Sequence, residues 1–205
     1  MENTQDTVVK NIIFDLSEVI YYGYYGVENE IEKSGIHKKV FLERKQETLD
    51  FFFDTMRGKY SEDDYFEMFL KDTNWNVSVN DLKKYFRNNI KKPVKGTKEI
   101  IQKLKRKYKL ILLSDYLKEW REYLESFDEL PMFDYKFFSY QYRKLKQDNG
   151  TFQLILDKLK IKPEETLFID DNEKNVQCAE KIGIKGIIFI DSEQLKKELR
   201  NLNLL

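Results

Sequence analysis

A short apolar run that ends at an acidic residue constrains the fold of this chain more than any other feature. Residues 8–14 are rich in Val, Ile and Phe, and Asp15 follows them directly. Such a run predicts a strand that is buried on both faces, as strands of parallel sheets are. Parallel α/β sheets bind ligands outside the carboxyl ends of their strands, so Asp15 lies where the chemistry of such a fold is expected.

Strand-like runs alternate with helical patterns in the second half of the chain. The helical patterns include apolar positions 117, 120, 124 and 127, which predict a helix that covers the sheet, and a final helix for which Ser192 is the predicted cap. The further strands are expected at residues 109–113, 135–138, 166–169 and 186–190. This alternation predicts a doubly wound, five-stranded parallel sheet with right-handed crossovers, a Rossmann-like α/β core.

Residues 21–91 have a different character from the rest of the chain. They are rich in aromatic residues and contain no clear strand pattern. Two helix starts resemble capping boxes, Ser61 with Asp64 and Ser78 with Asp81. The pattern predicts a small helical cap at 21–91 that is inserted after the first strand, which leaves 1–20 and 92–205 as the core.

Polar residues follow the predicted strands at the ends where a site would form. Ser17 and Glu18 come just after Asp15, and the later strands are followed by Ser114-Asp115, Lys146 and Asp170-Asp171. Because the carboxyl ends of parallel strands meet at one edge of a sheet, we expect these residues to converge under the cap. Asp15 is expected to be a solvent-facing carboxylate at that edge.

This set of residues resembles the motifs of the haloacid dehalogenase-like hydrolase superfamily, whose members are mostly phosphatases. The stretch FDLSEV is most similar to the FDLG-N-V type motif of sugar-phosphate phosphatases and of the amino-terminal domain of epoxide hydrolases. The resemblance implies Mg²⁺-dependent hydrolysis of a small phosphate monoester through an aspartyl-phosphate intermediate. The implied roles are these: Asp15 as nucleophile; Ser114, Asp115 and Lys146 as phosphate-binding residues; Asp15, the Ser17 backbone carbonyl, Asp170 and Asp171 as metal ligands.

Two positions depart from the family pattern. Ser17 stands where related phosphatases carry a second Asp that acts as general acid and base, so Glu18 or a cap residue would have to replace it. Lys146 competes with Lys144 for the lysine role, and Lys146 is favoured because Phe152 follows at the spacing of the family's aromatic residue. A phosphate-binding regulatory protein therefore stays open as an alternative. A haloacid dehalogenase, in which Asp attacks carbon without a metal, is a third reading.

Composition narrows the remaining classes. The chain has 36 Lys and Arg and 36 Asp and Glu, so its formal net charge is zero. It therefore has no overall positive charge that would attract nucleic acid or anionic lipid. The single cysteine, Cys178, cannot make an internal disulfide, and the single histidine, His37, cannot by itself make a catalytic triad or a zinc site. The amino terminus has no signal-peptide pattern, and no apolar run has the length of a membrane span. We expect a cytoplasmic protein that binds a small phosphorylated metabolite. The sequence does not indicate an oligomeric state.

Overall fold

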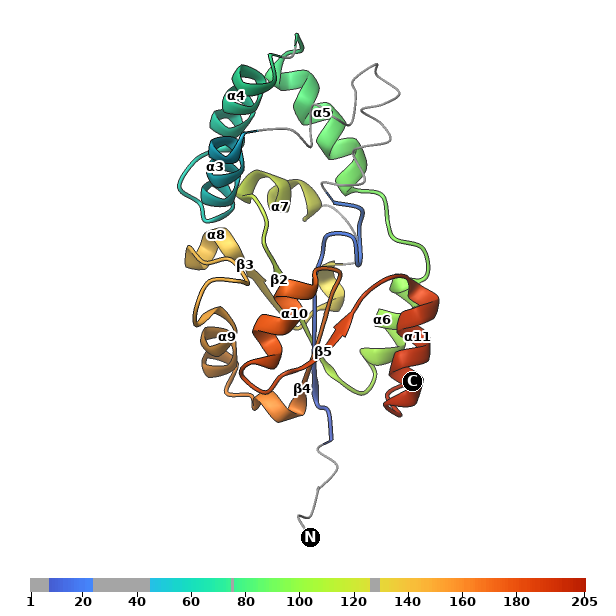
Figure 1. The fold of residues 1–205 in the computed structure, drawn as a ribbon. Coiled ribbons are helices and arrows are strands. Elements are labelled where there is room, and N and C mark those ends of the chain that lie inside the picture. The colour runs from blue at the N-terminus through green and yellow to red at the C-terminus, as the bar shows by residue number, and fades with distance from the viewer. Residues whose placement is uncertain (1–7, 24–44, 75, 126–129) are drawn as a thin grey trace.

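A five-stranded, all-parallel sheet forms the core of the protein, as predicted. The computed structural model describes residues 8–23, 45–74, 76–125 and 130–205. The strand order is β3-β2-β1-β4-β5, so β1 lies at the centre of the sheet (Figure 1). At its carboxyl end, Phe14 of β1 pairs with Leu112 of β2 and Ile169 of β4. The strands are β1 (Asn11–Phe14), β2 (Lys109–Ser114), β3 (Tyr135–Phe138), β4 (Thr166–Asp170) and β5 (Lys185–Ile188).

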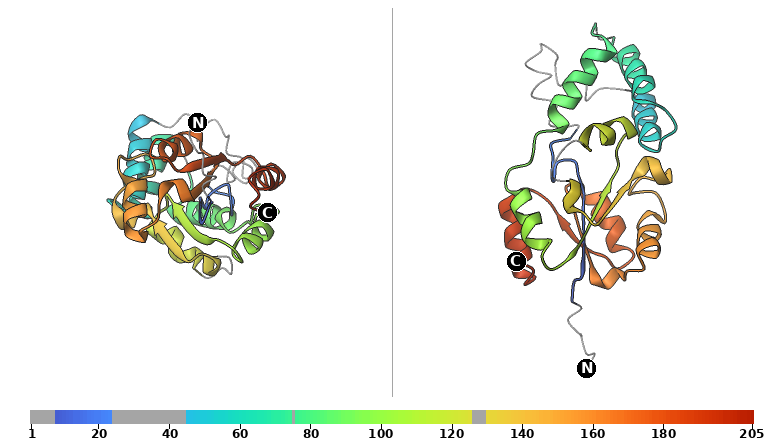
Figure 2. Two further views of the ribbon diagram at one scale, coloured as in Figure 1. Left: turned by 90° about the horizontal axis from the view of Figure 1, so that it is seen from below. Right: turned by 180° about the vertical axis from the view of Figure 1, so that it is seen from behind.

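Helices cover both faces of this sheet because neighbouring strand residues point to opposite faces. Ile12 and Phe14 pack in the cluster that includes residues of α6 (Thr97–Leu104) and α11 (Ser192–Asn201). Ile13 packs instead with residues of α9 (Thr151–Leu159) and α10 (Glu173–Glu180). The view from behind in Figure 2 shows the two helix pairs on opposite sides of the strands. These are the two covered faces of a doubly wound fold.

Several element boundaries differ from the sequence expectation. Strand β1 begins at Asn11 instead of Val8, and β5 ends at Ile188 instead of Ile190. Val8 and Ile190 are 70% and 74% exposed. Their apolar side chains had led to predicted strands that extend beyond the observed ends. The prediction that Ser192 caps the final helix was wrong. Asp191 has the extended backbone of a cap residue, and its carboxylate accepts from the Glu193 and Gln194 backbone N–H groups.

Three helices among the described residues between β1 and α6 lie beyond the carboxyl ends of the strands (Figure 1). Both predicted capping interactions are present: the Ser61 and Ser78 hydroxyls each accept from the backbone N–H three residues on, at 3.1 Å. The division into core and cap stays a prediction, and much of the predicted cap, including His37, lies outside the described residues. The helices are α3 (Gln46–Met56), α4 (Glu62–Thr73) and α5 (Val79–Ile90).

The two chain segments that lead to and from these helices are bonded to each other. The Tyr22 backbone N–H donates to the Lys92 carbonyl at 2.9 Å, and the Val94 N–H donates to the Ile20 carbonyl at 2.8 Å. Tyr21 and Pro93 form an antiparallel bridge between these bonds. The chain therefore leaves and re-enters the core at one place.

Helix α7 (Lys118–Leu124) does not simply cover the sheet, as its apolar spacing suggested. It lies between the sheet and the cap helices (Figure 1). Its Trp120 ring lies 6.2 Å from the Phe52 ring of α3 and 5.5 Å from the Phe86 ring of α5, measured between centroids. The Trp120 indole N–H also donates to the buried Glu62 carboxylate at 2.7 Å. The aromatic face of α7 thus joins the core to the cap helices.

The remaining short elements complete the described fold. Helix α8 (Ser139–Tyr142) follows β3, and the 3₁₀ turns are Leu130–Met132 and Pro163–Glu165. No helix among the described residues is long and apolar enough to cross a bilayer.

Candidate active site

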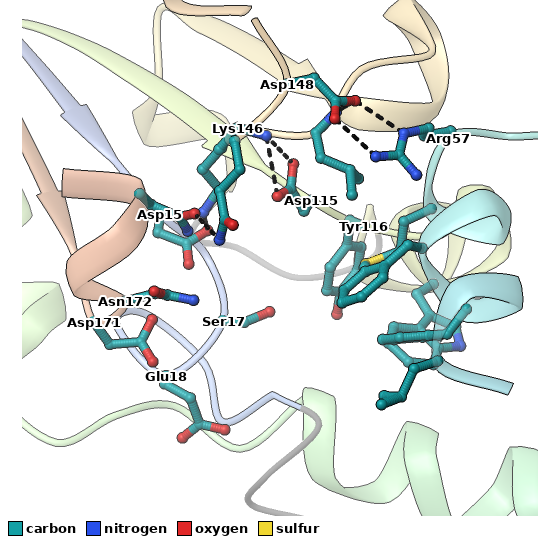
Figure 3. A pocket seen from close by; sticks show the side chains of 18 residues that line it. Asp15, Ser17, Glu18, Arg57, Asp115, Tyr116, Lys146, Asp148, Asp171 and Asn172 are labelled. Atoms are coloured by element: carbon teal, nitrogen blue, oxygen red, sulfur yellow. Dashed lines mark hydrogen bonds and ion pairs between the residues drawn. The ribbon is translucent and has the colours of Figure 1, made fainter. Parts of the chain in front are cut away.

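One buried lysine joins two carboxylates at the carboxyl ends of neighbouring strands. The Lys146 Nζ atom lies 2.8 Å from Asp15 Oδ1 (Figure 3). The same atom lies 2.6 Å from Asp170 Oδ2. All three residues are at most 5% exposed. The expectation that Asp15 faces solvent was therefore wrong, because Lys146 and the strand ends enclose it. Lys144 instead donates to the Asn149 carbonyl, so of the two candidate lysines only Lys146 contacts Asp15.

Three carboxylates at this edge are placed to share a cation. Asp15, Asp170 and Asp171 each offer an oxygen, and these oxygens lie within 4.8 Å of one another. Burial raises the pKa of Asp15 well above its usual value, Lys146 opposes that rise, and the two neighbouring acids add to it. Burial and Asp170 likewise raise the pKa of Asp171 to about 6. Such a set of hard oxygen donors with excess negative charge fits Mg²⁺.

The Lys146 ammonium stays charged in this setting. Burial alone would lower the pKa of Lys146, but the carboxylates of Asp15, Asp170 and Asp115 outweigh burial and raise it. The ammonium is therefore a fixed positive charge beside Asp15. A buried charge that is paired in this way holds its partners in one geometry.

A layer of amide groups orients Asp170. The Asn172 backbone N–H and the Asn175 side chain donate to Asp170 Oδ1 at 2.8 and 3.0 Å. Asn175 is 6% exposed, and its own carbonyl accepts from Gln147. Asn175 is a site residue that was not predicted from the sequence. Its place in the first turn of the helix that follows the acid pair was the available signal, since that turn faces the strand end.

Ser114 and Asp115 end β2 beside this cluster, and their surroundings differ. The Ser114 hydroxyl is fully buried and has no hydrogen-bond partner within the described structure. The Asp115 carboxylate accepts from the Lys146 backbone N–H at 3.0 Å and thereby fixes the loop that carries the lysine. Burial raises the pKa of Asp115 to about 6 although Lys146 opposes it.

A cavity of about 440 Å³ opens between these strand ends and the cap helix α3. Asp15, Ser17, Glu18, Asp115 and Asp171 line one side (Figure 3). We call the opposite side the apolar wall. It consists of Leu49, Phe52, Phe53 and Met56 of α3 together with Tyr116 and Trp120. Among the described lining residues, Ser114 is absent, so the structure brings Asp115 but not Ser114 to the cavity surface.

A bidentate ion pair ties the cap helix to the lysine loop. Arg57 donates to both carboxylate oxygens of Asp148, at 2.9 and 2.7 Å. Asp148 also accepts from the Leu145 backbone N–H at 2.8 Å. A second tie is the Ser139 hydroxyl, which donates to the Met56 carbonyl at 2.6 Å. Neither contact was predicted from the sequence, because no local pattern relates residues that lie so far apart in the chain.

Replacing Lys146 with Met is expected to lower the free energy of unfolding by about 3–5 kcal/mol at pH 7.5 in EDTA. The change leaves Asp15 and Asp170 buried without their cation. The pKa of Asp15 in the folded variant then rises further, because Lys146 no longer opposes the effect of burial, so the loss of stability is larger at pH 7.5 than at pH 5. Urea unfolding at both pH values measures it. Lys144→Met is the control, and equal stability of the two variants would contradict the prediction.

Acids and a lysine lie at the carboxyl edge of a doubly wound parallel sheet, beneath helices that follow the first strand. This arrangement defines a doubly wound α/β protein with a carboxylate site at its strand ends. The family model described as haloacid dehalogenase-like hydrolase matches residues 11–189. The chain belongs to this family.

Solved structures of the family share this fold. A haloacid dehalogenase family enzyme of Bacteroides thetaiotaomicron, solved as a magnesium complex, superposes with a TM-score of 0.74 at 21% identity, over 94% of this chain and 98% of that one. An L-2-haloacid dehalogenase of Xanthobacter autotrophicus, with chloropropionic acid covalently bound, gives a TM-score of 0.68 at 16% identity, over 97% and 85% of the two chains. At these identities the likeness shows the fold alone.

Curated relatives match shorter stretches. Flavin mononucleotide hydrolase 1 of Arabidopsis thaliana is 34% identical over 61 residues, which are 30% of this chain and 25% of that protein. Drimenol cyclase drtB of Aspergillus calidoustus is 28% identical over 75 residues, which are 37% of this chain and 14% of that protein. The matched stretches thus span a quarter or less of these relatives.

Proposed function

We propose that this hydrolase is a Mg²⁺-dependent phosphatase that cleaves a small phosphate monoester in the cavity beneath α3. The observation that carries the proposal is the shared position of Asp15, Asp170 and Asp171, whose oxygens lie within 4.8 Å of one another beside Lys146. A nucleophilic carboxylate splits one difficult displacement into two easier ones. The name of the Arabidopsis relative, a flavin mononucleotide hydrolase, agrees with phosphate ester chemistry. A cytoplasmic location and a small phosphorylated metabolite as ligand belong to the same proposal.

In the first step an Asp15 oxygen attacks phosphorus, the bond to the leaving oxygen breaks, and that oxygen takes a proton from water, which gives an aspartyl phosphate and an alcohol. In the second step water attacks the same phosphorus, the bond to Asp15 breaks, and inorganic phosphate leaves. Lys146 holds the attacking carboxylate and offsets charge on the phosphoryl oxygens. The Asp115 backbone N–H is a proposed donor to phosphate oxygens, whereas the buried Ser114 hydroxyl does not reach the cavity surface and is not assigned that role. Mg²⁺ held by Asp15, the Ser17 carbonyl, Asp170 and Asp171 would neutralise the charge that accumulates there.

The other two readings make different use of the same fold. A dehalogenase attacks carbon and needs no cation, whereas the clustered carboxylates of Asp15, Asp170 and Asp171 favour a site built for one. A regulatory phosphate-binding protein is favoured by Ser17, since a serine hydroxyl is a poor general acid at neutral pH. Ser17 lines the cavity beside Asp15. Turnover separates these readings.

The test is a screen of phosphorylated metabolites for release of inorganic phosphate, with Mg²⁺ and with EDTA. We expect release that depends on Mg²⁺ and declines as pH falls below about 6, because Asp171 and Asp115 take up protons there. Release that chelation leaves unchanged would contradict the metal's role. Tight binding of phosphate without turnover of any substrate would support the regulatory reading instead.

A further inference from the structure

We infer that the site selects phosphate monoesters whose leaving group carries a planar aromatic ring and no second anionic group. This inference rests on the proposed phosphatase function, because it assigns the phosphate to the acidic side of the cavity. The leaving group must then extend toward the apolar wall. What that wall can bind decides the substrate class.

Four aromatic rings form a continuous series along the apolar wall. The Phe53 and Phe52 ring centroids are 6.4 Å apart, and the Phe52 and Trp120 centroids are 6.2 Å apart. Tyr116 follows at 5.5 Å from Trp120 in an edge-on arrangement. Such arrays present faces and edges to a further ring, and the thioether of Met56 beside them adapts to aromatic shapes.

The wall offers little to a sugar or polyol. Of the two side-chain donors in the wall, the Trp120 indole N–H is already bonded to Glu62 at 2.7 Å, which leaves the Tyr116 hydroxyl as the one polar group of the wall for a ligand. The α3 side of the wall consists of Leu, Phe and Met side chains only. Hydroxyl groups placed against it would lose their bonds to water without gaining partners, which disfavours binding. The proposed ligand is therefore apolar beyond its phosphate.

The charges around the cavity disfavour a second anionic group. Among the described lining residues the cations are Lys146 and Arg57. Lys146 is paired with Asp15 and Asp170, and Arg57 is paired with Asp148 and Asp54. The other charged lining residues are acids. A carboxylate or second phosphate on the leaving group would thus meet like charge.

The size of the cavity limits the ligand to a few rings. Its volume is about 440 Å³, toward the small end of ligand pockets. A cavity of about 150 Å³ already accepts benzene in another protein, so a phosphoryl group with one or two rings fits here. The predicted class is thus a benzyl, phenyl or naphthyl type monoester.

The experiment compares benzyl phosphate, cyclohexylmethyl phosphate and glycerol 1-phosphate with Mg²⁺ present. All three release a primary alcohol, so differences in kcat/KM report on the cavity and not on leaving-group chemistry. We expect benzyl phosphate to exceed glycerol 1-phosphate by about 10- to 100-fold, from the apolar area that the ring buries. Cyclohexylmethyl phosphate should lie between them, and 4-carboxybenzyl phosphate well below benzyl phosphate. Equal turnover of the benzyl and glycerol esters, or of the benzyl and cyclohexylmethyl esters, overturns the inference and leaves the phosphatase proposal standing.

A variant pair tests the wall directly. Phe53 is 39% exposed, so Phe53→Ser removes a ring from the wall at little cost to folding. It should lower kcat/KM for benzyl phosphate relative to that for glycerol 1-phosphate by about 3- to 10-fold. Tyr60 is 43% exposed and does not line this cavity, so Tyr60→Ser is the matched control. Equal effects of the two variants contradict the inference.

Binding of non-hydrolysable probes separates the two proposals. Calorimetry with Mg²⁺ compares benzylphosphonate with 2-hydroxyethylphosphonate. If no ester is hydrolysed but benzylphosphonate binds more tightly, the phosphatase proposal fails and the aromatic ligand class stands. If no ester is hydrolysed and neither phosphonate is preferred, both fail.

Discussion

Asp15→Asn is expected to lower the rate of phosphate release by about 10³-fold or more, while the protein stays folded. An amide oxygen does not form the acyl phosphate. The substitution keeps the shape of the side chain and can still accept from the Leu16 backbone N–H, which lies 2.6 Å from Asp15 Oδ1. It also removes one negative charge from a crowded set of acids, while Lys146 keeps its 2.6 Å contact with Asp170. Phosphate release and thermal unfolding, measured on the same preparation, test the prediction.

Asp157→Asn is the control for Asp15→Asn. Asp157 lies on α9, away from the cavity, and its carboxylate accepts from Gln153 one helical turn earlier. The control should keep full activity. Loss of folding together with activity in Asp15→Asn would assign Asp15 a structural role, and unchanged turnover would place the nucleophile elsewhere.

Ser17→Asp is expected to speed the hydrolysis of esters with poor leaving groups by about 10²–10⁴-fold, the usual contribution of a general acid. In Figure 3 the Ser17 side chain points toward the cavity, so a carboxyl group there can protonate a leaving oxygen. Gly23 packs behind it: a Cβ atom at Gly23 would lie 2.7 Å from the Ser17 Cβ atom. The longer side chain must therefore extend forward. Turnover across a series of aryl phosphates measures the effect.

The natural protein should show turnover that rises steeply as leaving-group pKa falls, where departure limits the rate. Ser17→Asp should flatten this slope, and Ser17→Asn, which has the same size but no transferable proton, should leave it steep. A shallow slope in the natural protein would mean that another group already supplies the proton. Glu18 is the neighbouring candidate, although its carboxylate accepts from the Gly23 backbone N–H at 2.9 Å, and Glu18→Gln would identify it.

The part of the site that lies at strand ends was predictable from the sequence. Asp15 and Asp170 each follow a buried apolar run, and parallel pairing of β1 with β4 brings the two runs into register. The identity of the site lysine was not predictable from periodicity. Lys144 and Lys146 lie two residues apart in one loop, and periodicity does not indicate which of them contacts Asp15. The family's spacing to an aromatic residue favoured Lys146, which is the lysine that contacts Asp15.

Features that depend on contacts between residues far apart in the chain were not predictable from the sequence. The Arg57–Asp148 pair joins residues 91 positions apart, and neither lies in a pattern that distinguishes it from a surface charge. Trp120 has helical spacing with its neighbours, but spacing cannot tell whether its partner is the sheet or the cap. Likewise Asp191 and Ser192 are both good cap residues, and only the extended backbone at Asp191 decides between them.

The paired segments at residues 20–22 and 92–94 have a consequence for how a protein of this kind can change over evolutionary time. Their two hydrogen bonds use backbone atoms only, so they do not depend on which side chains occupy these positions. The intervening chain begins and ends at the same point, and insertions or exchanges within it need not displace β1. Residues of the apolar wall on α3 can therefore vary and alter ligand choice while Asp15, Lys146 and Asp170 keep their places. New specificity can arise on an unchanged reaction centre.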